Sequence, residues 1–198
     1  MTLHLRRSTT IAAEPTRDAL GAGQAIRDAA EAFLDATAEL PSGHTVPTPW
    51  YAEGTGVTVA AATRLLLGEQ VIHGHDIAKA AGRKWMIDTA DAELIFGAIR
   101  AMLPIIAKAE AIDGLSASFD IRVRHQSPFT VRISDGRVRV DSPAHGDVDC
   151  HIVAAPVALL LVGYGRKSQW SAIAGGNMFT WGRKPWLAFR FAALFYNP

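Results

Sequence analysis

Glu69 and His73 are the residues whose types and spacing most clearly suggest chemistry. They are four positions apart within the segment GEQVIHGHDIA, residues 68–78. Four positions make about one helical turn, so the two side chains would stand one above the other. Carboxylate and imidazole groups at this spacing can reach one divalent ion, of which zinc is the usual choice. A plain hydrogen-bonded Glu/His pair is the alternative, and spacing alone does not separate the two.

The neighbours of this pair suggest further roles. Asp76 is a candidate outer partner that would fix the tautomer of a histidine ring. His75 lies roughly 200° around a helix from His73 and is expected on a polar face. Gly68 and Gly74 each cost a helix about 1 kcal/mol relative to alanine, so they predict a close backbone approach or a kink.

A helix over residues 57–81 would position these groups. Apolar residues recur in it at helical spacing and would form one apolar face. They are Ala62, Leu65, Leu66, Ile72, Ile77 and Ala80. Glu69 and His73 fall within this stripe and are therefore expected to face the core. Charged groups in a core are unfavourable unless a partner or a metal neutralises them, which favours a built site.

Composition narrows the class of protein. The 198 residues suffice for one domain or two small ones, 49% are hydrophobic and the net charge is +1, which gives no general reason to expect nucleic-acid binding. Cys150 is the single cysteine, so no internal disulfide forms, and this fits the reducing cytoplasm. No apolar signal core follows Arg6 and Arg7, and no apolar run is long enough to predict a membrane span.

Charge is uneven along the chain. No Asp or Glu follows Asp149, whereas five cations do: Arg166, Lys167, Arg183, Lys184 and Arg190. Such a local positive field would suit an anionic ligand, for example a carboxylate or a lipid headgroup. A solvated basic face is the alternative interpretation.

The rest of the chain is predicted as helices followed by a sheet. Helices are expected over 16–40, over 57–81 and from Thr89 or Asp91, with a kink at Pro104. Near Gly114 the period changes to two, and strands are expected over 116–125, 129–133, 137–140 and 148–154, forming an antiparallel meander. Asp135-Gly136 is a strong hairpin signal. In the first strand Asp120 is expected to point outward.

The C-terminal part mixes helices with a short strand. Helices are expected over 156–162 and 168–175, an edge strand over 177–181 and a helix over 185–195. The last helix is apolar almost all round, so it is buried, lines a ligand cavity or docks on a partner.

Several common sites are missing from the sequence. There is no phosphate-binding loop, no dinucleotide fingerprint and no nucleophile elbow. Cys150 and His151 are adjacent in a predicted strand, so they should point to opposite faces, and Cys150 is interpreted as structural.

A family resemblance adds to these observations. The string Glu69-x-x-x-His73-Gly74-x-Asp76-x-Ala78-x-Ala80-x-Gly82 resembles the signature of the mycothiol-dependent maleylpyruvate isomerase family, within the DinB-like helical-bundle superfamily. The C-terminal half, including Ala172-Ile173-x-x-Gly176, resembles the sterol carrier protein type 2 fold. The resemblance implies an α+β protein with a partial DinB-like bundle over 1–112 and a sterol-carrier-like domain over 113–198.

The same resemblance implies a site. Glu69 and His73 would ligate a divalent metal, usually zinc, and an open position would activate a thiol such as mycothiol. The family's third ligand is a histidine on an earlier helix. In this sequence only His4, followed by Leu5, resembles it, and two bundle helices are missing. Either His4 serves, or a second chain completes the site, or the site is degenerate. An incomplete bundle leaves an apolar face, which predicts a homodimer.

Three functions follow from the sequence. The first is a thiol-dependent isomerase or transferase in which Arg183 or Arg166 holds a substrate carboxylate. The second is a non-catalytic protein that binds an apolar, lipid- or sterol-like ligand between the sheet and residues 185–195. Its tunnel would be lined by Leu159, Leu160, Trp186, Phe189 and Phe191. The third is a dimeric scaffold that has lost both activities.

Overall fold

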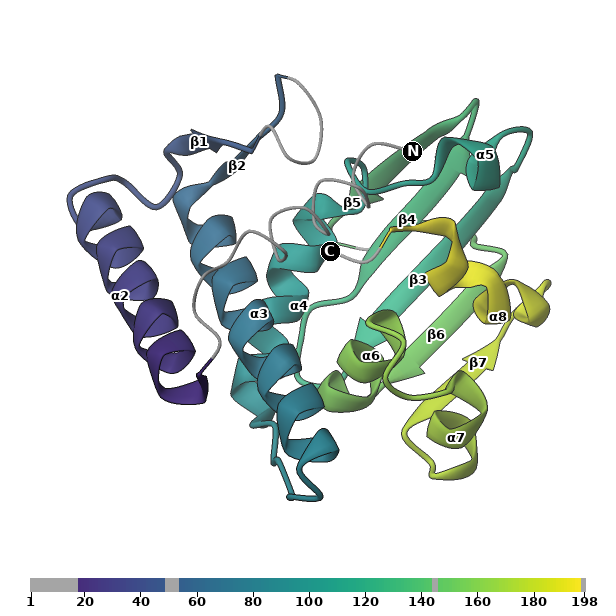
Figure 1. Ribbon diagram of the computed structural model, residues 1–198. Coiled ribbons are helices and arrows are strands. Elements are labelled where there is room, and N and C mark those ends of the chain that lie inside the picture. The colour runs from purple at the N-terminus through teal and green to yellow at the C-terminus, as the bar shows by residue number, and fades with distance from the viewer. Residues whose placement is uncertain (1–17, 49–53, 144–145, 197–198) are drawn as a thin grey trace. The chain divides into compact units, whose positions relative to one another are not determined.

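The computed structural model describes residues 18–48, 54–143 and 146–196 (Figure 1). The chain divides into two compact units, one up to Thr63 and the other from Arg64 onward. The division falls inside a helix, and each unit is described by itself below. The predicted domain boundary at 112/113 stays a prediction.

Among its described residues, the first unit contains helix α2, a small sheet and the beginning of a helix that starts at Val59. Helix α2 spans Ala19–Thr37, close to the predicted 16–40, and begins where the Asp18 carboxylate accepts a hydrogen bond from the Gly21 N–H at 2.6 Å. Strands β1 (Thr45–Pro47) and β2 (Gly56–Thr58) pair antiparallel. None of the residues of α2 is buried, and Leu20, Ile26 and Leu34 are exposed. A homodimer that covers these side chains stays a prediction.

Helices α3 (Val59–Ala80), α4 (Thr89–Met102) and α5 (Ala109–Ile112) lie between the small sheet and the main sheet along the chain. The Asp88 carboxylate caps α4 by accepting from the Ala90 N–H at 2.7 Å. Helix α4 ends two residues before Pro104, so the proline follows the helix and does not kink it, contrary to the prediction.

The main sheet has five strands, and it is mixed. They are β3 (Ala117–Val123), β4 (Phe129–Ser134), β5 (Arg137–Asp141), β6 (Cys150–Ala154) and β7 (Met178–Trp181), in the spatial order β5-β4-β3-β6-β7. Strand β6 pairs with β3 in parallel, whereas the other pairs are antiparallel. The predicted meander is therefore wrong beyond β5, because the chain crosses from β5 to the far side of β3 before it forms β6.

The β4–β5 hairpin follows the prediction in detail. Asp135 and Gly136 both have positive φ, 52° and 65°, as the favoured two-residue hairpin turn requires. In contrast, Asp120 does not face water. Strand β3 is central, and Asp120 is 3% exposed although its neighbours Phe119 and Ile121 are buried on the other face.

Short helices pack against the sheet after β6. They are α6 (Pro156–Gly163), α7 (Gln169–Ala174), η1 (Pro185–Leu187), α8 (Ala188–Phe191) and η2 (Ala192–Leu194). Figure 1 shows α6 and α8 in front of the sheet. Helix α6 is also in contact with α4. The predicted helix over 185–195 is thus found as one uninterrupted helical run over 185–194, with 3-10 geometry at both ends and α geometry between them.

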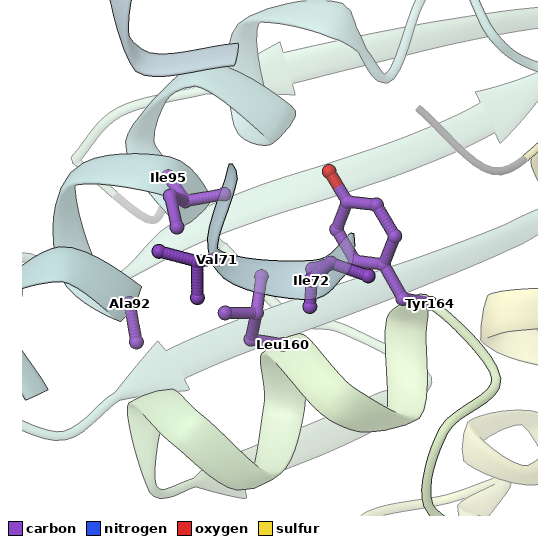
Figure 2. Packing of buried hydrophobic residues seen from close by; sticks show 6 residues of the cluster. All are labelled: Val71, Ile72, Ala92, Ile95, Leu160 and Tyr164. Carbon is purple, nitrogen blue, oxygen red and sulfur yellow. The ribbon is translucent and has the colours of Figure 1, made fainter. Parts of the chain in front are cut away.

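A small core joins α3, α4 and α6 (Figure 2). It consists of Val71, Ile72, Ala92, Ile95, Leu160 and Tyr164. A Cβ atom on Gly68 would lie 3.1 Å from Ile95 Cγ2, and one on Gly74 would lie 2.6 Å from the Trp85 ring. The predicted close approach at both glycines is therefore confirmed.

Candidate functional site

Glu69 and His73 do pair, but they face solvent and not the core. Glu69 Oε2 lies 3.1 Å from His73 Nε2, and the two side chains are 47% and 62% exposed. The buried face of α3 instead contains Val71 and Ile72. The expectation of a core-facing pair is wrong. Gly68 belongs to the buried face of α3 together with Val71 and Ile72, and because a glycine has no side chain, the apolar pattern of the sequence does not identify this face.

Of the ligands that the metal prediction requires, the described residues supply two, Glu69 and His73. Across 18–48, 54–143 and 146–196, no three His, Cys, Asp or Glu side chains gather as a metal site. His4, the predicted third ligand, lies outside the described residues. Glu69 and His73 alone do not complete the three protein ligands of a catalytic zinc centre. The zinc and mycothiol assignments therefore stay predictions, and no reaction step is derived through them.

Asp76 binds an arginine. Arg166 Nη2 donates to Asp76 Oδ2 at 2.6 Å, and Arg166 Nε donates to Oδ1 at 3.1 Å, a bidentate pair. Arg166 Nη1 also donates to the Tyr164 carbonyl oxygen at 2.6 Å. The hydrogen bond from Arg166 lowers the pKa of Asp76, and the hydrogen bond to Asp76 raises the pKa of Arg166. Asp76 thus joins α3 to the segment after α6.

His75 lies beside this ion pair. Its Nδ1 atom is 3.6 Å from Asp76 Oδ1, and its side chain is only 20% exposed. The expectation that His75 occupies a polar, solvated face is therefore only partly met.

The two arginines predicted to hold a carboxylate meet different partners. Arg166 is engaged by Asp76, whereas Arg183 Nη2 lies 3.4 Å from Asp149 Oδ1. Lys184 Nζ approaches the same oxygen at 3.2 Å. Burial raises the pKa of Asp149, but hydrogen bonds from Lys184 and Ser118 outweigh it, so the pKa is lowered overall. The carboxylate-holding role of either arginine stays a prediction.

An apolar cavity lies between the helices and the sheet in the second unit. Residues of α4 and the turn after it, of β6, of α6, of β7 and of the final segment form its wall. They are Phe96, Ile99, Leu103, Ile106, Ile152, Leu159, Leu160, Val162, Gly163, Gln169, Met178, Ala188, Phe191, Ala192, Phe195 and Tyr196. The hollow measures about 730 Å³ with its open mouth, of which about 70 Å³ admits the centre of a water molecule. The cavity is therefore narrow.

The wall has almost no polar chemistry. Among the described residues that line it, Gln169 and Tyr196 alone have polar side-chain groups, and none is charged. The Gln169 amide is already engaged, since Nε2 donates to the Phe189 carbonyl oxygen at 3.0 Å. The Tyr196 hydroxyl lies 3.4 Å from Glu110 Oε1. Such a wall can exclude water and hold an apolar group, but it offers no acid–base pair.

The predicted tunnel residues are found in part. Leu159, Leu160 and Phe191 line the cavity. Trp186 is 58% exposed and does not, and Phe189 stacks on Trp170 with ring centroids 4.5 Å apart. These two assignments fail because helical spacing places the lining residues of this segment, Ala188, Phe191, Ala192 and Phe195, on one stripe that contains neither Trp186 nor Phe189.

Sequence reasoning missed the contribution of α4 and the turn that follows it. Phe96, Ile99, Leu103 and Ile106 recur at helical spacing, which predicts an apolar face but does not distinguish a cavity wall from a filled core. Cys150, by contrast, is structural as interpreted. It is fully buried, and burial raises the pKa of its thiol.

No protein-family model matches the chain, and no curated protein sequence matches it. Solved structures do. A UbiJ-SCP2 ubiquinone synthesis protein is 20% identical with a TM-score of 0.43, covering 52% of this chain and 93% of that one. The sterol carrier protein domain 2 of Helicoverpa armigera is 15% identical with a TM-score of 0.39, covering 48% and 76%.

A third similar structure is larger. The sec-alkylsulfatase Pisa1 from Pseudomonas sp. is 12% identical with a TM-score of 0.47, and the match covers 89% of this chain but 28% of that enzyme. Sterol-carrier-like structures are thus among those similar to this chain. All three TM-scores lie below 0.5, so the functional argument rests on the cavity. The isomerase and DinB-like parts of the resemblance stay predictions.

Proposed function

We propose that the chain binds a slender apolar ligand, such as a fatty acyl chain, in the cavity between α4, α6, β6, β7 and the final segment. The observation that carries this proposal is the composition of the wall. In the described part of the chain sixteen residues line the cavity, and of these sixteen only Gln169 and Tyr196 have polar side-chain groups. Ligand pockets in proteins are mostly apolar with few polar groups, and this one is at the apolar extreme.

The dimensions of the cavity favour a chain over a rigid ring system. The part of the cavity that is wide enough to admit the centre of a water molecule measures about 70 Å³. This volume is well below the roughly 300–1,000 Å³ of common ligand pockets. A flexible alkyl chain can enter a narrow space one methylene at a time. A fused-ring sterol would require the wall to move as a whole.

A movable wall is available at the mouth. Gly163, Ala192 and Tyr196 line the cavity and are themselves exposed, so they mark where it opens. The segment η1–α8–η2 is one helical run of ten residues, 185–194, that changes between 3-10 and α geometry. An isolated helix of this length is marginal in water, so the segment depends on its packing. It can therefore shift to admit a longer ligand at modest cost.

The wall chemistry favours binding over catalysis. The described residues of the wall include no carboxylate, imidazole, thiol or amine. The proposed activity is thus the sequestration of an apolar molecule away from water. Separately, no helix in the described ranges is long and apolar enough to cross a membrane.

Competition with a fluorescent fatty acid tests this proposal. Saturated fatty acids of increasing length would be titrated into the full chain loaded with the probe. Each added methylene should tighten binding by about fourfold, since burying one methylene is worth about 0.8 kcal/mol, until the cavity is full. Cholesterol should compete poorly. Affinity that is independent of chain length would contradict a buried chain.

A further inference from the structure

The face of the sheet opposite the cavity carries a row of polar residues. Strands β3, β6 and β7 place Asp120, His151 and Trp181 side by side in register. Successive residues of a strand point to opposite faces, so His151 faces away from Ile152, which lines the cavity. Any ligand of this row would therefore be separate from a ligand of the cavity.

Asp120 fixes the His151 ring. The Asp120 side chain is 4% exposed, and its Oδ2 atom lies 2.8 Å from His151 Nδ1 and 2.7 Å from Arg122 Nε. The His151 ring also stacks on Trp181, with centroids 4.9 Å apart and planes 7° from parallel. The contact with Asp120 engages His151 Nδ1, and the stacking on Trp181 fixes the orientation of the ring plane. The other ring nitrogen, Nε2, is left for an outside partner.

A hollow lies next to this ring. It has a volume of about 400 Å³ and is lined by Gly146, Asp147, Val148, His151, Gly182 and Arg183. Gly182 has φ 128°, and a Cβ atom there would lie 2.7 Å from the Asp149 carbonyl oxygen. Only glycine allows this close approach of the two backbones, which places Arg183 at the hollow.

Among the described residues, two guanidinium groups lie near the hollow. Arg183 is part of its wall, and Arg132 Nη2 would lie 3.3 Å from a Cβ atom on the wall residue Gly146. Asp149 is held by the Ser118 N–H and hydroxyl, both at 3.1 Å, and by Lys184 Nζ at 3.2 Å. Arg183 makes only a longer 3.4 Å contact with it, and its side chain is 67% exposed. Asp120 is matched by Arg122. Asp147 is the opposing charge on the wall, and it is exposed.

We propose that this hollow is a second ligand site, for a small molecule whose anionic group also carries a hydroxyl, such as hydrogen phosphate. The Arg183 guanidinium pairs with the anion. Because the Asp120 carboxylate accepts from His151 Nδ1–H, the other ring nitrogen, Nε2, is an acceptor in the neutral imidazole, and it accepts a hydrogen bond from the P–OH group of the ligand. Asp120 acts through His151 as a positioning residue. Asp147 weakens the site for a plain anion, because its carboxylate is a like charge on the wall.

Titration of inorganic phosphate into the full chain tests the site. The imidazole resonances of His151, assigned by their loss in His151→Asn, would be followed by NMR against chloride at matched ionic strength. Phosphate should move them saturably. Arg183→Gln should weaken binding about tenfold or more, because it removes a charge-assisted, fork-shaped donor. Asp147→Asn should tighten it about twofold, as removal of an exposed like charge does.

Arg139→Gln is the matched control, since Arg139 is an exposed arginine of β5 that does not line the hollow. It should leave the phosphate affinity unchanged. A non-saturable response, or equal affinities of the Arg183 and Arg139 variants, would overturn the proposal. Weaker binding in Asp147→Asn would also overturn it, because it would indicate a cation site. Fatty-acid binding should be the same in all these variants, because the hollow and the cavity share no lining residue. The proposed fatty-acid site and the proposed phosphate site are therefore tested independently.

Discussion

The side-chain amide of Gln169 in α7 donates a hydrogen bond to the backbone carbonyl oxygen of Phe189 in α8, over 3.0 Å. The next residue, Trp170, stacks on the Phe189 ring. These two contacts hold the final segment beside the cavity that Gln169 itself lines. They join α7, which contributes Gln169 to the cavity wall, to the final helical segment.

Removal of this hydrogen bond should speed ligand exchange. Gln169→Ala leaves the Phe189 carbonyl without its partner, and we expect a bound fatty acid to dissociate several-fold faster in stopped-flow displacement. Gln126→Ala is a matched control, because Gln126 Nε2 also donates to a backbone carbonyl, that of Glu93, at 2.8 Å. Gln126 is not a cavity residue. Equal dissociation rates in the two variants would contradict a role of Gln169 in retention.

Leu160 serves both the core and the cavity. It is 1% exposed, belongs to the cluster of Figure 2 and lines the cavity. Leu160→Ala should lower the free energy of unfolding by about 3 kcal/mol, because it removes buried methyl groups and leaves a void. Urea denaturation measures this change. Leu161→Ala, at a partly buried position, should cost clearly less, and equal costs would show that α6 packs differently.

The Asp76–Arg166 pair should make stability depend on pH on the acid side. The hydrogen bond from Arg166 holds the pKa of Asp76 below its ordinary value of 3.8 in the folded chain. The contribution of the pair is therefore present above the unfolded pKa and is lost as the pH falls through the folded one. Because Asp76 is about one-third exposed, we expect about 1 kcal/mol.

Thermal unfolding of Asp76→Asn against wild type checks this sign. The difference in the free energy of unfolding should be full above about pH 5 and should shrink as the pH falls below the ordinary aspartate range. A difference that stays constant down to strongly acidic pH would show that Asp76 contributes by packing and not by charge.

Elemental analysis of the purified chain tests the zinc prediction. Glu69 and His73 supply two ligands, and stable zinc centres in proteins have three or four. We therefore expect added zinc to bind weakly, to be lost on gel filtration, and to bind still less in His73→Ala. Retention of about one zinc per chain would instead show that residues outside the described ranges, such as His4, or a second chain complete the site.

Much of the helical architecture was predictable from periodicity and caps. Helices α3 and α4 lie within a few residues of their predicted bounds, since both combine apolar spacing with clear ends. The β4–β5 hairpin was equally predictable, because Asp135-Gly136 satisfies a local backbone requirement. Local signals of this kind need no knowledge of the rest of the fold.

Features set by distant contacts were not predictable. The residues of β3 and β6 do not indicate that these strands pair in parallel, since β4 and β5 lie between them in the sequence. That pairing buries Asp120 and brings it to His151, so this pair was missed. The orientation of Glu69 and His73 was missed for a similar reason. The buried face of α3 includes Gly68, which packs against Ile95, and an apolar pattern does not reveal a glycine as part of a buried face.

The most direct test of the account is a comparison of Ala192→Trp with Ala193→Trp. Both alanines are exposed neighbours, but only Ala192 lines the cavity. Fatty-acid affinity of the two variants would be measured with the fluorescent probe, after circular dichroism shows that both are folded. The account predicts that Ala192→Trp blocks the mouth and weakens binding about tenfold or more, whereas Ala193→Trp binds like wild type. Equal binding by the two variants would contradict the assignment of this cavity as the ligand site.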